Sequence, residues 1–161
     1  MLGDKRAARR HQEYLDSRRR DRERTMRSTL AKAAGLTGMA LVVRVDTWNH
    51  LLTRPHLGAL LAGIDASRID GDPASVRATL TVTLSGPQLV HLAAGLFADK
   101  ETDDPGPAEE ATRAIAGRLY PVLAAAIDTA CPGSPYLGPA PATARELATV
   151  VLDAPSGPPS R

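Results

Sequence analysis

The densest cluster of polar and aromatic side chains in the sequence is formed by Asp46, Trp48 and His50. Asp46 and His50 are four residues apart, so on a helical turn they would share one face. A carboxylate beside an imidazole can move a proton near neutral pH. These three residues are therefore the candidate pocket. Residues of the same types also cap helices and pack cores, and that structural role is the expected one.

A run of arginines near the amino terminus is the second candidate, because guanidinium groups can contact several phosphates or an acidic protein surface. Asp16, Asp21 and Glu23 lie among these arginines and oppose phosphate, and no aromatic residue is interleaved for base stacking. We therefore expect a protein partner, with nucleic acid as the alternative. The candidate binding residues are Arg18, Arg19, Arg20, Arg22, Arg24 and Arg27.

The sequence lacks the spacing of known metal and catalytic motifs. A structural zinc site needs four Cys or His ligands at short paired spacing, whereas this chain has four scattered histidines and one cysteine. The acidic run over residues 98–107 does not follow the order of a calcium loop, and we expect a solvated surface loop there. No nucleophile elbow, phosphate loop, dinucleotide motif or zincin motif occurs. The sequence thus predicts no metal and no cofactor.

Charge is distributed unevenly along the chain. Residues 1–32 hold eleven Lys and Arg against five Asp and Glu, a net +6, and the remaining nine basic and thirteen acidic residues give −4. The 161 residues suit one domain with tails, and only five of them are aromatic, so aliphatic side chains must fill the core. The chain therefore reads as a basic arm on an acidic body.

The sequence favours the cytoplasm and gives no sign of a membrane segment. The single cysteine, Cys131, cannot form an intramolecular disulfide, and the charged amino terminus lacks the apolar segment of a signal peptide. No apolar run approaches the ~18 residues that span a bilayer. Whether Met1 is the true start, rather than Met26 or Met39, stays open, as does homo-oligomer formation.

Two strands and the helices beside them are expected to form the core. Residues 4–34 contain no proline and should form a charged helix that projects from the body and docks only its second half. Residues 39–45 and 76–84 read as strands. Ser85 and Gln88 form a capping box for a helix that follows the second strand at once. If the helix between the strands is a crossover, the strands should be parallel.

Three further segments complete the expected fold. Residues 53–63 and 85–95 share a pattern of Ser or Thr, x, Pro, x, Leu, which implies two similar capped helices and leaves duplication open. Residues 108–130 should form the longest apolar helix. A proline-rich connector over residues 131–141 precedes residues 148–152, where strand is favoured over helix, although Thr143 and Glu146 could cap a final short helix.

These elements predict an α+β fold, with a small two- or three-stranded sheet packed against helices. The expected divisions are a basic helical arm (1–34), a compact α+β domain (35–153) and a disordered tail (154–161). The preferred function is a small non-enzymatic cytoplasmic adaptor that engages a protein partner through the basic helix. The alternatives are a nucleic-acid-associated regulator that uses the same arginines and an enzyme centred on residues 46–50.

Overall fold

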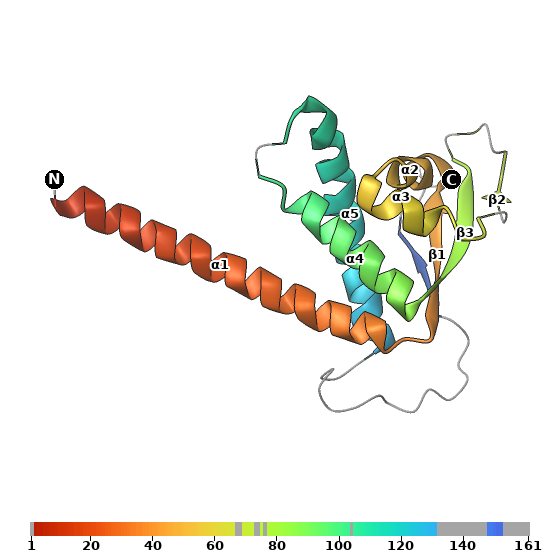
Figure 1. The fold of residues 1–161 in the computed structure, drawn as a ribbon, viewed down its shortest axis with the longest axis horizontal. Coiled ribbons are helices and arrows are strands. Elements are labelled where there is room, and N and C mark those ends of the chain that lie inside the picture. The colour runs from red at the N-terminus through yellow and green to blue at the C-terminus, as the bar shows by residue number, and fades with distance from the viewer. Residues whose placement is uncertain are drawn as a thin grey trace, which may run out of the picture.

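The structure, a computed structural model, combines five helices with a mixed sheet (Figure 1). It describes residues 2–66, 69–72, 75, 77–103, 105–131 and 148–152. The elements, in chain order, are α1 (Leu2–Ala34), β1 (Gly38–Arg44), α2 (Val45–Leu52), α3 (Pro55–Leu61), β2 (Ile69–Asp70), β3 (Thr79–Ser85), α4 (Gly86–Lys100), α5 (Pro107–Ala130) and β4 (Ala148–Val151).

The sheet has four strands in the order β2-β3-β1-β4, so β1 and β3 are central. β1 pairs antiparallel with β3, with Leu41 opposite Val82, and it pairs parallel with β4, with Leu41 opposite Val150. The predicted α+β class is confirmed, as is the strand at the carboxyl end of the described chain. The sheet has four strands, one more than the two or three that the sequence predicts. The additional strand is β2, which is too short, at two residues, to show an alternating pattern.

The prediction of parallel strands was wrong, since β1 and β3 are antiparallel. β2 pairs antiparallel with β3 and therefore points in the same direction as β1. The crossover through α2 and α3 thus leads to β2, and the chain reverses once more before β3. The sequence predicts only a turn where β2 lies. Because the chain passes through β2 and then turns back, β3 runs antiparallel to β1.

Alternation along the central strands decides which face of the sheet is covered. Met39, Leu41 and Val43 of β1 are fully buried, and β3 buries every second residue in the same way. The threonines of β3 lie on the opposite, more open face, as the period of two requires. α4 and α5 pack against each other, and the helices cover the buried face of the sheet (Figure 1).

The two helices with the shared sequence pattern begin differently. At α4, the carboxamide oxygen of Gln88 accepts hydrogen bonds from the backbone N–H and the hydroxyl of Ser85, at 2.8 and 3.0 Å. At α3, Thr53 does not cap the helix, because its hydroxyl donates to the backbone carbonyl of His50 at 2.6 Å, and Arg54 is the N-cap residue. The predicted cap is therefore confirmed at the start of α4 and is wrong at the start of α3.

α1 is a single helix of 33 residues that extends away from the body (Figure 1). Its carboxyl-terminal part packs on α4 and α5, and its amino-terminal part extends beyond them. This confirms the predicted projecting, half-docked helix. The predicted proline-rich connector after Cys131, the cap at Thr143 and Glu146 and the tail at 154–161 lie outside the described residues.

Candidate functional site

The first half of α1 is exposed around its whole circumference. Every residue from 5 to 22 is exposed, which at 1.5 Å per residue is a rod of about 27 Å. A lone helix of this length has no buried face of its own to stabilise it. Its direction is therefore set by the docked half of α1, residues 23–34.

The anchor of α1 combines buried side chains with two ion pairs. Thr29 and Ala33 are buried, and Lys32 donates to Asp128 of α5 at 2.6 Å. Arg22 pairs with Glu101, just beyond α4, at 3.1 Å. These contacts join α1 to both long helices of the body and hold the exposed half in place.

Tyr120 of α5 lies beneath this anchor. Burial raises the pKa of its phenol above the usual 10.0, and this effect outweighs a hydrogen bond with the Thr29 side chain that lowers it. The Tyr120 ring packs edge-on against Phe97, with centroids 5.4 Å apart, and the Lys100 ammonium lies 5.4 Å from the Tyr120 centroid. Two of the few aromatic residues of the chain are thus placed where α1, α4 and α5 meet.

Six arginines lie on the side of α1 that faces away from the body. Successive residues turn by about 100° around the helix, so they fall roughly opposite the buried Thr29 and Ala33. Glu13 shares this side and pairs with Arg9 at 3.0 Å. We call this surface the outward stripe; its arginines are Arg6, Arg9, Arg10, Arg20, Arg24 and Arg27.

The structure divides the six arginines that the sequence singles out. Arg20, Arg24 and Arg27 belong to the outward stripe. The other three lie on the side toward the body: the Arg18 guanidinium is 5.7 Å from the Tyr14 ring centroid, Arg19 pairs with Glu23 at 3.2 Å, and Arg22 pairs with Glu101. The sequence run does not reveal this division. It also leaves out Arg6, Arg9 and Arg10, which the helical repeat adds to the stripe.

An open groove of about 530 Å³ separates the exposed half of α1 from the end of α4. One wall is α1, with Arg18, Arg19 and Arg22, and the opposite wall includes Glu101 and Asp103. The groove is also lined by apolar side chains. Tyr14 is 56% exposed and Leu15 45% exposed, and Phe97 of α4 is half-buried beside them.

Asp46, Trp48 and His50 all lie on α2, where each makes a separate contact. The Asp46 carboxylate pairs with Arg44 and accepts a hydrogen bond from the Thr47 N–H at 2.8 Å. Partial burial raises the pKa of Asp46, but these bonds outweigh it and leave the pKa below the usual 3.8. Trp48 is part of the core at 3% exposed, and His50 Nε2 lies 3.0 Å from the Thr112 hydroxyl of α5.

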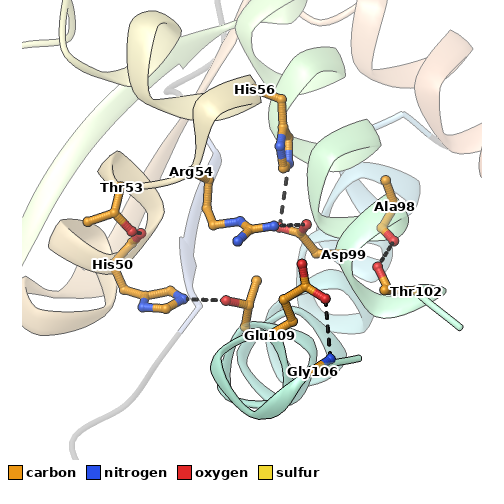
Figure 2. Close-up of polar contacts among 10 residues, drawn as sticks. His50, Thr53, Arg54, His56, Ala98, Asp99, Thr102, Gly106 and Glu109 are labelled. Carbon is orange, nitrogen blue, oxygen red and sulfur yellow. Dashed lines mark hydrogen bonds and ion pairs between the residues drawn. The ribbon is translucent and has the colours of Figure 1, made fainter. Parts of the chain in front are cut away.

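A buried ion pair that the sequence analysis missed joins the start of α3 to the end of α4 (Figure 2). Asp99 is 6% exposed, and its Oδ1 accepts a hydrogen bond from Arg54 at 2.9 Å. His56 Nε2 lies 3.4 Å from Asp99 Oδ2, and neither that oxygen nor Arg54 Nε has a hydrogen-bond partner within the described chain. The side chains of Arg54 and His56 point toward Asp99 (Figure 2).

The prediction of a solvated loop over residues 98–107 was wrong for its first three residues. Residues 98–100 form the last turn of α4, and the Asp99 carboxylate turns inward to meet a guanidinium 45 positions earlier in the chain. The acidic run in the sequence does not indicate which of its carboxylates forms an ion pair with a residue far away in the chain. The contact ties α3 to α4, and α4 also packs on α1.

Three further findings concern metal binding, membrane insertion and similarity to known proteins. Within the described ranges, no group of three or more His, Cys, Asp or Glu side chains could hold a metal ion. None of the helices searched, all from the described part of the chain, is long and apolar enough to cross a membrane. Comparisons of the chain with protein-family models, curated proteins and solved structures found no match.

Proposed function

We propose that this protein is a small non-enzymatic adaptor of the cytoplasm that binds an acidic surface of a protein partner with the outward stripe of α1. The observation that carries the proposal is the stripe itself, six arginines on one side of an exposed helix with a single acid, Glu13, among them. A guanidinium binds a carboxylate with two parallel hydrogen bonds, which suits a fixed row of such groups.

The negative charge of the body favours a protein as the partner, rather than a long polyanion such as nucleic acid. Glu101 is half-buried, and Asp103, Glu109 and Glu110 are exposed, between the end of α4 and the start of α5. These carboxylates lie on the body side of α1 and lower the positive potential around the arm, which weakens long-range attraction of an extended polyanion. The single cysteine, Cys131, is compatible with the reducing cytoplasm.

One observation favours a nucleic-acid-associated regulator as the second candidate. Two of the three acids that interrupt the arginines in the sequence, Asp16 and Glu23, line the groove on the other side of α1, while Asp21 lies at the edge of the stripe, at nearly the same angle around the helix as Arg10. The stripe is thus more uniformly basic than the sequence run. Phosphates and carboxylates remain alternative ligands for the same guanidinium groups.

The proposal is tested by photo-crosslinking in the native cell. A photoreactive residue replaces Ser17, which is exposed on the stripe side, and in a matched control it replaces Thr83, which is exposed on β3. We expect Ser17 to crosslink to an acidic region of one protein, and Thr83 to leave that protein unlabelled. Crosslinks from Ser17 to nucleic acid alone would move the assignment to the second candidate, and equal labelling from both positions would overturn the proposal.

The nucleic-acid alternative has its own measurement in the purified protein. Each phosphate contact adds about 0.9 to the salt dependence of duplex binding. Deletion of residues 1–33 is unsuitable, because it would remove the buried Thr29 and Ala33 and expose the core. Deletion of residues 2–20 leaves the anchor intact. Steep salt-dependent binding to DNA or RNA that this deletion abolishes would favour the second candidate.

A further inference from the structure

The outward stripe consists of two groups of three arginines rather than one even row. One group, the tip triad, lies near the amino terminus of α1, and the other, the anchored triad, lies beside its docked half. About 15 Å of helix separates the two groups, and the stripe positions between them hold Glu13 and Ser17. The tip triad is Arg6, Arg9 and Arg10, and the anchored triad is Arg20, Arg24 and Arg27.

The anchored triad lies where contacts with the body hold the helix. Arg22 pairs with Glu101 at 3.1 Å, and Met26 packs against the core. The arginines of the anchored triad lie beside these contacts, on the outward side of the same turns of helix. A ligand that binds there meets side chains on a helix that is already ordered, so less binding free energy is lost in ordering it than at the tip.

The two triads also differ in the ion pairs that their arginines already make. In the tip triad, Arg9 pairs with Glu13 at 3.0 Å, so an acidic ligand must compete with that carboxylate. Arg24 and Arg27 make no ion pair within the described residues, and Asp21 lies at the edge of their triad rather than inside it. The body carboxylates that form ion pairs with α1 are thereby neutralised. The anchored triad is therefore the part of the stripe with the most available positive charge.

From these differences we propose that the anchored triad is the primary contact of the stripe, and that it binds a compact patch of carboxylates on a folded protein. The inference rests on the proposed function, because it specifies which part of the outward stripe binds and how large the partner's acidic patch is. From Arg20 to Arg27 the helix rises by about 10 Å. Three carboxylates within that length would each meet one guanidinium group.

Nuclear magnetic resonance of the full-length protein with an end-capped tetraglutamate peptide tests this inference. The extended peptide is at most about 14 Å long, so it can cover one triad but not both. We expect the side-chain N–H signals of Arg24 and Arg27 to report a dissociation constant at least about threefold lower than those of Arg6 and Arg10. An end-capped tetraglutamine peptide is the matched control and should move neither set of signals.

Two double variants with the same loss of charge give a second measurement. Arg24→Gln with Arg27→Gln should abolish the tighter binding, and Arg6→Gln with Arg10→Gln should leave it within about twofold of the wild-type value. Equal dissociation constants at the two triads, or tighter binding at the tip, would overturn this inference and leave the proposed function standing. Signals that move at neither triad would overturn the proposed function as well.

Discussion

The buried carboxylate of Asp99 is the residue on which the contact between α3 and α4 depends most. Asp99→Asn removes the charge that Arg54 meets while keeping the shape of the side chain. We expect a loss of about 1–3 kcal/mol in the free energy of unfolding, less than for a fully buried pair because Arg54 is 24% exposed. Urea denaturation measures it.

Asp103→Asn is the matched control, because it makes the same change in an exposed carboxylate four residues away. Its free energy of unfolding should stay within about 0.5 kcal/mol of the wild-type value. Equal effects of the two substitutions would show that the Arg54 pair does not stabilise the fold. The two aspartates look alike in the sequence, and burial alone separates them.

Asp46 gives a prediction about pH. Bonds from Arg44 and Thr47 hold its pKa in the folded state below the usual 3.8. Its contribution to stability is therefore complete above the ordinary pKa and is lost as the pH falls through the lower, folded value. The difference in free energy of unfolding between the wild type and Asp46→Asn should shrink as the pH falls from about 5 to about 3. A difference that did not change with pH would contradict this role.

At the scale of elements, the start of α4 fixes the end of α1. A Cβ on Gly86 would lie 2.5 Å from the carbonyl oxygen of Leu36 and 2.9 Å from that of Ala33. These are backbone atoms, so one of the two helices would have to move. Gly86→Ala should therefore cost about 1–3 kcal/mol of unfolding free energy, in spite of the better helix propensity of alanine.

Gly117→Ala on α5 is the control for this substitution. Nothing lies within 4 Å of the added Cβ, so the change in helix propensity acts alone and should stabilise by up to about 1 kcal/mol. Thermal unfolding of both variants measures the contrast. If both substitutions stabilised the protein, close packing of α4 on the end of α1 would not determine the direction of the arm.

Element types were more predictable from the sequence than their connections. The alternation in β3, the Ser85 and Gln88 pair and the long charged run of α1 are local signals, and the structure confirms the elements they predict. The direction of β3 depended on β2, a strand of two residues without a recognisable pattern. The ion pair of Arg54 with Asp99 joins distant segments, which no local pattern describes.

At the scale of the molecule, a helical arm extends from a small α+β body, and its two sides differ. The outward stripe follows from the period of the helix once the docked side is known, but the sequence alone does not say which side docks. Thr29 and Ala33 supply that reference. The stripe and the groove thus lie on opposite sides of the arm.

The central claim is that the outward stripe binds the partner. Its most direct measurement is the affinity of the protein crosslinked from Ser17 for the wild type and for a variant with all six stripe arginines replaced by glutamine. Because each exposed pair contributes about 0.2–1 kcal/mol, we expect the affinity to fall at least about tenfold, and less so at high salt. An unchanged affinity, with the variant's helix content intact by circular dichroism, would contradict the account.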